Sequence, residues 1–215
     1  AVEAELKKNV EALLAVARAL SEKRKKAAKK IEDLIEKTLR ELAFNNTQFR
    51  IEVSQETDPE GKYKINFNGI DRIDFLFSAN IGEPLKPLAK IVSGGELSRI
   101  MLSLKSILAD VDNVPVLIFD EVDAGIGGKT ADSVGKKLLR ISGKHQLICI
   151  THLPQIASLA DHHLRIEKRQ KGGRISVSVV ELSGADRQDE IARMLSGTVT
   201  EISRRHAEEL LERTR

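Results

Sequence analysis

The stretch that decides the fold of this 215-residue chain reads Val116-Leu117-Ile118-Phe119-Asp120-Glu121. Its four apolar residues do not alternate with polar ones, which is typical of a strand buried on both faces of a parallel sheet. A helix is predicted at 131–141, and a second unalternating strand follows at 146–150. Strand–helix–strand succession with right-handed crossovers predicts an α/β fold.

An acidic pair, Asp120 and Glu121, stands at the end of the first strand. Ligand sites in parallel sheets lie beyond the carboxyl ends of the strands. We therefore expect Asp120 to hold Mg²⁺ through the water shell of the ion. Glu121 is expected to polarise the water that attacks the terminal phosphate of a nucleotide. The alternative is an acidic pair that only caps the next helix, where the helix dipole favours negative charge.

A histidine, His152, follows the second strand. Sequential strands usually lie side by side, so this histidine is expected close to the acidic pair. There it can donate to a phosphate oxygen or position a water, the alternative being a histidine satisfied within its loop. The remaining histidines have no comparable setting; a metal site at Asp161 to His163 is disfavoured because adjacent residues point apart on a strand.

Two glycine-rich stretches lie on either side of the first strand. Ser93-Gly94-Gly95-Glu96 opens a helix predicted at 94–110, and its hydroxyl and bare backbone N–H groups form a natural cradle for phosphate oxygens. The other stretch, 125–130, ends in Gly-Lys-Thr like a P-loop. However, Asp123 stands where the first glycine belongs, and nearby carboxylates repel a triphosphate. We expect Val122 to Gly128 to form a flexible turn that meets a partner subunit; a self-contained nucleotide binder using Gly128-Lys129-Thr130 is the alternative.

A long helix is predicted at 2–43, before these motifs. Small and apolar residues recur at alternating steps of four and three, which predicts a coiled-coil seam with Arg24 inside it. The partner helix is expected from another chain or from a part of the protein outside this sequence, and the missing cap at the start favours a fragment boundary. The basic run 23–30 either contacts DNA phosphates or forms a solvated coiled-coil face.

The remaining elements are predicted from alternation and turn residues. Strands are expected at 49–53, 63–67 and 73–77, and later near 163–167 and 175–181 on either side of the Gly172-Gly173 turn. Helices near 186–195 and 200–213 close the chain. We divide it into a coiled-coil arm, 1–44, and a head lobe, 45–215.

Composition narrows the class of protein. Apolar residues make up 41% of the chain and aromatic residues 3%, which predicts a core of Val, Ile and Leu. A net charge of +3 does not by itself indicate nucleic-acid binding. The single Cys149 excludes an internal disulfide and fits a reducing compartment. No apolar run is long enough to span a membrane, so a cytoplasmic protein with no membrane partner is expected.

Taken together, the motifs resemble the C-terminal half of an ABC-type ATPase head of the structural-maintenance-of-chromosomes (SMC) kind. In that resemblance Ser93 to Glu96 match the signature motif, Val116 to Glu121 match Walker B with its catalytic glutamate, and His152 matches the switch histidine. The runs 84–88, 120–128 and 150–157 further resemble the RecN family of bacterial DNA repair proteins.

This resemblance implies the fold: a C-terminal lobe with a mostly parallel sheet and flanking helices, preceded by a long coiled-coil helix. It implies ATP and Mg²⁺ as ligands, with ATP held by the P-loop of an N-terminal half. Ser93, Gly94, Gly95 and Glu96 would cap the ATP of an opposing head in a homodimer, while Asp120, Glu121 and His152 would serve the nucleotide of their own head.

The implied process is double-strand break repair on DNA at the bacterial nucleoid. Without a P-loop this chain alone is predicted to hydrolyse no ATP. One departure is visible: many ABC heads carry an aspartate six residues after the glutamate, where this chain has Gly127. The nearby Asp123 is the candidate for that contact between heads. The alternatives are another coiled-coil ABC ATPase of chromosome organisation and a non-catalytic coiled-coil interaction module.

Overall fold

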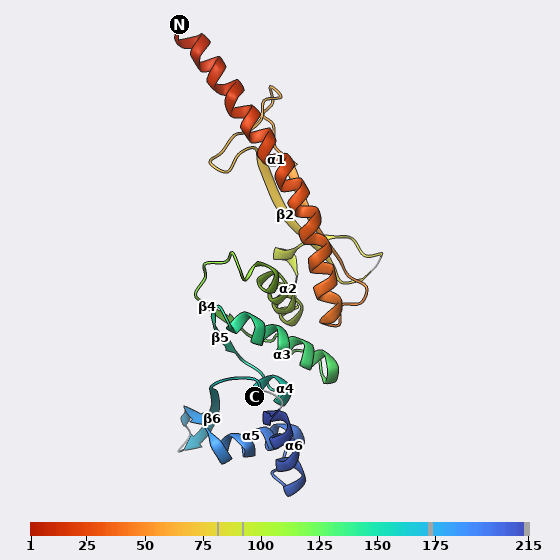
Figure 1. Cartoon of the computed structure of the whole chain (residues 1–215), viewed down its shortest axis with the longest axis vertical. Coiled ribbons are helices and arrows are strands. Elements are labelled where there is room, and N and C mark those ends of the chain that lie inside the picture. Colours follow the sequence, from red (N-terminus) through yellow and green to blue (C-terminus); the bar gives the residue numbers. More distant parts are fainter. Residues whose placement is uncertain (81, 92, 172–173, 213–215) are drawn as a thin grey trace. The chain divides into compact units, whose positions relative to one another are not determined.

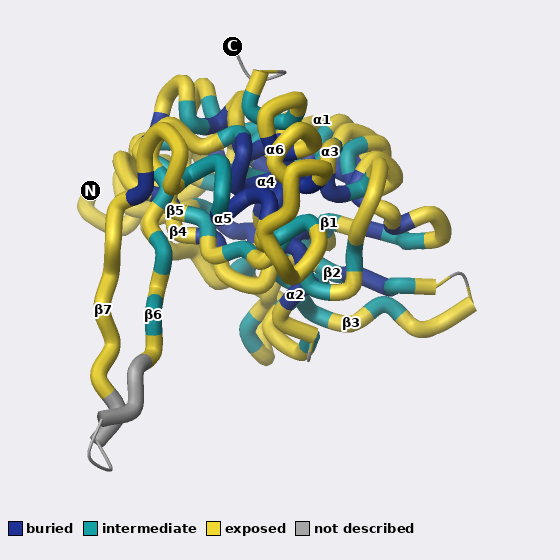
Figure 2. The backbone as a smooth tube through the Cα atoms, turned by 90° about the horizontal axis from the view of Figure 1, so that it is seen from below, coloured by how far each residue is buried: buried dark blue, intermediate teal, exposed yellow. Residues whose placement is uncertain are grey.

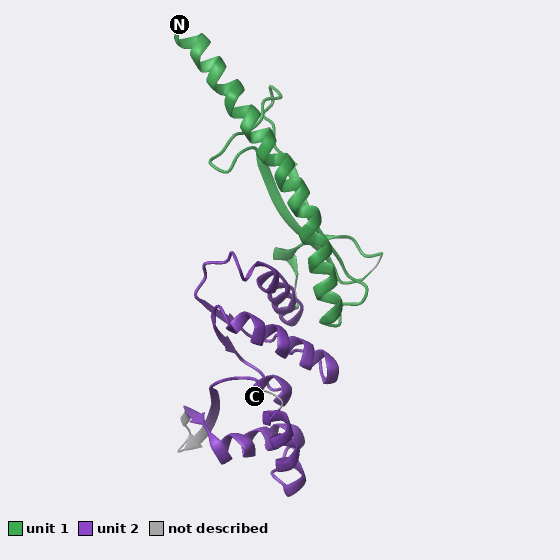
Figure 3. Ribbon diagram, in the orientation of Figure 1, with its two compact units in different colours: residues 1–93 green, residues 94–215 purple. Residues whose placement is uncertain are grey.

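The computed structural model describes residues 1–80, 82–91, 93–171 and 174–212, leaving out the side chains of 169–171 and 174–175. The chain forms two compact units, residues 1–93 and residues 94–215 (Figure 3). The strands that follow the arm helix therefore group with that helix. The functional division at residues 44 and 45 stays a prediction.

The first unit is a long helix lying along a small antiparallel sheet (Figure 1). Its order is β1-β2-β3, and Gln48 faces Ser78 while Gln55 faces Asp71. One stripe of the helix is buried, at the four- and three-residue steps that an amphipathic helix provides. The elements are α1 (Val2–Glu41), β1 (Gln48–Gln55), β2 (Asp71–Ser78), β3 (Lys86–Pro87) and the 3₁₀ helix η1 (Leu88–Lys90).

Polar contacts join α1 to the sheet. The backbone N–H of Ile51 donates to Glu32 at 2.8 Å, and that of Phe49 donates to Glu36 at 3.2 Å. Arg24 forms an ion pair of 2.9 Å with the buried carboxylate of Asp71. The arginine that interrupts the predicted seam is thus held by the sheet of its own unit.

The N-terminal part of α1 leaves its apolar seam exposed. Leu6, Val10, Leu13 and Leu20 are all exposed, although each is an apolar residue at a seam position. Exposed apolar residues at heptad spacing are expected where a second helix packs in a coiled coil.

The strand predicted at 63–67 is wrong. Only isolated bridges occur there, between Thr57 and Tyr63 and between Asn66 and Gly69. Asn66 and Gly69 exchange backbone hydrogen bonds of 2.9 and 3.0 Å and close a turn with a φ of +100° at Gly69. Because β1 and β2 pair directly with each other, the alternating residues between them become their connection.

The second unit begins at the predicted glycine pair and contains a parallel and an antiparallel pair of strands. β4 pairs with β5 in parallel, and β6 pairs with β7 in antiparallel fashion. Among the described residues, parallel pairing is confined to β4 and β5. The predicted turn at Gly172-Gly173 and the last residue of the final predicted helix lie outside the described residues. The elements are α2 (Gly94–Leu108), β4 (Val116–Phe119), α3 (Gly128–Ser142), β5 (Gln146–Cys149), α4 (Pro154–Ala157), β6 (His163–Lys171), β7 (Arg174–Leu182), α5 (Gly184–Ser196) and α6 (Glu201–Glu212).

The expectation that β4 is buried on both faces is wrong for this chain. Leu117 and Phe119 are buried, whereas Ile118, on the opposite face, is 65% exposed. Ile148 on β5 shares the exposed face, and Figure 2 shows that the β6–β7 hairpin is also largely exposed. Apolar residues cover both faces of the pair, but the described residues bury only one of them.

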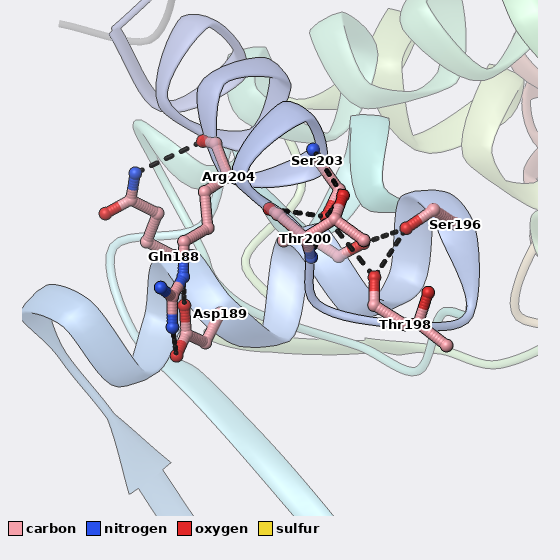
Figure 4. A network of polar contacts seen from close by, with 8 residues as sticks. Gln188, Asp189, Ser196, Thr198, Thr200, Ser203 and Arg204 are labelled. Carbon is pink, nitrogen blue, oxygen red and sulfur yellow. Dashed lines mark hydrogen bonds and ion pairs between the residues drawn. The ribbon is translucent and has the colours of Figure 1, made fainter.

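Helices α5 and α6 close the unit through an apolar cluster and a polar network. Ile191, Ala192 and Ala207 are fully buried in the cluster. Arg204 holds Asp189 through two hydrogen bonds of 2.6 and 2.8 Å (Figure 4). Thr200 and Ser203 exchange backbone-to-side-chain bonds at the start of α6, a reciprocal cap that satisfies two free N–H groups. In the described part of the chain, no helix is both long and apolar enough to cross a membrane.

Candidate functional site

The acidic pair and the histidine lie in loops that leave the two parallel strands at the same, carboxyl end. Phe119 pairs with Cys149, and the N–H of Ile150 donates to the carbonyl of Phe119 at 2.9 Å. The loops that leave the two strands therefore start side by side at their carboxyl ends. This confirms the prediction that the strand ending in Asp120 neighbours the strand leading to His152.

Asp123 connects these two loops. Its Oδ2 accepts hydrogen bonds from the Thr151 hydroxyl at 2.5 Å and from the backbone N–H of His152 at 2.9 Å. The same oxygen lies 3.1 Å from Nδ1 of His152. Asp123 is buried, while the His152 side chain is 72% exposed. The carboxylate that the sequence assigned to a contact between heads is thus engaged within its own chain.

Glu121 occupies a strained backbone position. Its φ is +55°, a left-handed conformation that costs an ordinary residue about 1–2 kcal/mol. Its N–H donates to Oδ1 of Asp120 at 2.8 Å, and both residues are exposed. Strained non-glycine residues cluster at functional sites, which adds a structural reason to regard Glu121 as functional.

The start of α2 packs against the acidic loop. A Cβ on Gly95 would lie 2.8 Å from the Ala124 Cβ and 3.1 Å from the carbonyl oxygen of Glu121. A Cβ on Gly94 would meet Oε2 of Glu121 at 2.1 Å. The glycine pair therefore allows a close approach within one chain. Ser93 is the last residue of the first unit, and Glu96 lies in the first turn of α2.

Two further residues, which the sequence motifs did not indicate, fix this junction. The Ser98 hydroxyl donates to the carbonyl of Asp120 at 2.5 Å, and Nη1 of Arg99 donates to the carbonyl of Ala124 at 2.7 Å. Burial lowers the pKa of Arg99, an effect that Glu96 and Asp123 counteract. An arginine on the inward-facing stripe of α2, beside Ile100 and Leu102, was the available signal, since such a side chain needs polar partners.

Negative charge gathers at the strand ends. Burial, together with the carboxylates of Asp123 and Asp120, raises the pKa of Cys149 to about 12. Asp120 is exposed and one of its oxygens is bound by a backbone N–H, so it fits a water-mediated contact with Mg²⁺ better than a dry cage of ligands. Among the described residues, no three His, Cys, Asp or Glu side chains cluster as a metal site.

The second glycine-rich stretch is open. A Cβ on Gly125, Gly127 or Gly128 would meet nothing within 4 Å, and Gly127 caps the start of α3. In the basic run of α1, Arg24 is held by Asp71 and Lys25 by Glu22 at 3.0 Å.

Two solved structures show which fold this chain has. The Smc head domain with an extended coiled coil from Pyrococcus furiosus, solved with the C-terminal domain of ScpA, gives a TM-score of 0.53 at 21% identity over 84% of this chain and 42% of that chain. The Smc head domain with a coiled coil and joint from Pyrococcus yayanosii gives 0.50 at 21% identity over 79% of this chain and 29% of that chain. The chain has the fold of part of an ABC-type ATPase head with its coiled-coil helix.

Curated sequences show which proteins are related to this chain. Proteins named DNA repair protein RecN are 44% identical in Halalkalibacterium halodurans, over 90% of this chain and 34% of the relative, and 42% identical in Treponema pallidum, over 98% and 37%. The chain is a relative of the C-terminal part of RecN proteins. It spans about a third of the length of these curated relatives. No family model matches the chain.

Proposed function

We propose that this chain is the C-terminal part of a RecN-like ATPase that acts in DNA double-strand break repair. The observation that carries the proposal is that Asp120, Glu121 and His152 all follow the carboxyl ends of two paired parallel strands, whose loops are joined by the hydrogen bond from His152 to Asp123. Relatives at 42–44% identity, which are named DNA repair protein RecN, support a role of this chain in DNA repair.

Each residue has a distinct role in the proposed reaction. Mg²⁺ would offset charge on the nucleotide phosphates, and Asp120 would hold it through water. Glu121 would accept a proton from the attacking water, and His152 would position that water or a phosphate oxygen. Ser93, Gly94, Gly95 and Glu96 would close over the ATP of an opposing head, where the N-terminus of α2 favours negative charge.

An N-terminal half that carries the P-loop is the first proposed partner. The exposed apolar face of β4 and β5, which carries Ile118 and Ile148, supports this partner, because a second half of the head would bury it. A groove of about 1400 Å³, lined by β5, β6 and α5 residues, lies next to this face. Within the described residues β5 pairs only with β4, so its other edge is open to a further strand. A second copy of the head and DNA are the remaining proposed partners, in a bacterial cytoplasm.

The test is ATP hydrolysis by this chain co-expressed with a P-loop-containing N-terminal segment. The pair is expected to hydrolyse ATP, and Glu121→Gln is expected to lower kcat by about 100-fold or more, because a general base contributes 10²–10⁴-fold. Glu208→Gln, on an exposed position of α6, is the matched control and should leave kcat unchanged. Unchanged turnover in Glu121→Gln would contradict the role of Glu121.

The chain by itself is expected to be inactive. Steady hydrolysis by the isolated chain, abolished by Glu121→Gln, would overturn the proposed division between the two halves. Nucleotide binding by the isolated chain that is lost in Lys129→Ala would instead support the self-contained binder. Association with the P-loop half that does not respond to ATP would favour a non-catalytic interaction module.

A further inference from the structure

Asp123 is a buried carboxylate that the proposed chemistry does not use. It follows Glu121 by two positions, yet its side chain is only 4% exposed and is directed toward the loop after β5. A buried carboxylate is costly unless hydrogen-bond donors surround it. Here the Thr151 hydroxyl and the backbone N–H of His152 donate to it. These hydrogen bonds stabilise the buried carboxylate, and they also join the loop that carries Glu121 to the loop that carries His152.

These contacts fix both the backbone and the ring of His152. Thr151 not only donates to Asp123 but also accepts the N–H of Leu153 at 3.0 Å, just before α4 begins. The loop is therefore braced on both sides of the histidine. A carboxylate oxygen 3.1 Å from Nδ1 favours the tautomer with the proton on Nδ1. Nε2 is then the nitrogen left to act at the exposed side of the ring.

We propose that Asp123 is the positioning residue of the switch histidine, holding the His152 imidazole with its proton on Nδ1 and Nε2 turned outward. This inference rests on the proposed function only for its effect on turnover. A buried aspartate that fixes the tautomer and orientation of a functional histidine is a recurring arrangement in hydrolytic sites. Asp123 itself touches neither nucleotide nor water in this proposal.

The first experiment is side-chain ¹⁵N NMR of the histidines in the 215-residue chain. His152 is expected as the Nδ1–H tautomer in the wild type and as the Nε2–H tautomer in Asp123→Leu, which keeps the branch at Cγ but removes both acceptors. Asp123→Asn retains one acceptor oxygen and should restore the Nδ1–H form. His162, which contacts Glu181 at 2.7 Å, is the internal reference and should not change.

The wild-type spectrum alone keeps the inference falsifiable if Asp123→Leu does not fold. An Nε2–H tautomer at His152 in the wild type would overturn it, and so would an unchanged tautomer in a folded Asp123→Leu. Thr151→Val removes a donor to Asp123 but leaves the carboxylate beside the ring. It should therefore remove one hydrogen bond between the two loops without changing the tautomer of His152. A changed tautomer in Thr151→Val would contradict direct positioning by Asp123.

The second experiment measures turnover with the P-loop segment present. Asp123→Leu is expected to lower kcat by about 10- to 100-fold with an unchanged KM for ATP, by analogy with the loss of a group that orients a metal-ligating histidine. His152→Ala should do the same, and the double variant should be no slower than His152→Ala. Additive losses would contradict positioning through His152. If Glu121→Gln and His152→Ala both leave turnover unchanged, the proposed function fails, while the NMR result on Asp123 stands independently.

Discussion

Two glycine-rich stretches lie where helices of the second unit begin, and they depend on glycine for different reasons. At the start of α2, Gly95 is buried, with the Ala124 side chain and the Glu121 carbonyl where its Cβ would be. At the start of α3, a Cβ on Gly127 or Gly128 would meet nothing within 4 Å, but Gly128 has a φ of +52°. The first stretch requires space and the second requires backbone freedom. Similar composition therefore indicates a tightly packed junction in one place and an open loop in the other.

Gly95→Ala should have the largest effect, because it places a methyl group against two rigid neighbours. The Ala124 Cβ would be 2.8 Å away, closer than packed carbon atoms come, so the junction of α2 with the acidic loop must shift. We expect a loss of about 2 kcal/mol in the free energy of unfolding, as for other overpacked sites. Urea unfolding followed by circular dichroism measures it. A variant as stable as the wild type would show that this junction is not close-packed.

Gly128→Ala should have a smaller effect with a different cause. The added methyl group meets no neighbour, but a φ of +52° is unfavourable for alanine. The expected loss is about 1 kcal/mol, the usual cost of a left-handed conformation. The same unfolding experiment measures it. Gly128→Asn is the matched control, because asparagine tolerates this conformation and should recover part of the loss. Equal losses in both variants would mean that backbone angle is not the cause.

Gly127→Asp should have the smallest effect and the opposite sign. Gly127 is the N-cap of α3 with an extended φ of −167°, which any residue adopts, and no side chain caps this helix there. An aspartate can accept a free N–H of the first turn and interact with the helix dipole. We expect a gain of about 0.5 kcal/mol in unfolding experiments at low salt. A loss of that size would indicate that the loop before α3 is more crowded than its geometry implies.

Local patterns sufficed for most of the elements. The unalternating runs predicted the parallel pair of β4 and β5, and the spacing of apolar residues predicted α1, α2 and α3 within a few residues of their bounds. The segment 63–67 failed because alternation reports only that a residue pattern suits a strand. Whether a partner strand is available depends on the pairing of β1 with β2, which is a long-range contact.

The sequence predicted which residues belong to the candidate site but not which of them contact one another. Asp120 and His152 follow neighbouring strands, and that relation comes directly from parallel topology. The direction of the Asp123 side chain depends on the fold of two loops, and no spacing rule encodes it. Nor does the sequence reveal that Gly94 and Gly95 approach Glu121 within the chain, because a glycine does not specify which neighbour requires its small size.

The hydrogen bonds from β1 to the arm helix have a consequence for solubility. β1 is the outer strand of its sheet, and outer strands expose N–H groups that can recruit strands from other molecules. Glu32 and Glu36 accept the N–H groups of Ile51 and Phe49, so the helix occupies the very positions where an intruding strand would bind. The carboxylates of Glu32 and Glu36 on α1 thereby protect the edge of β1 from pairing with a strand of another molecule.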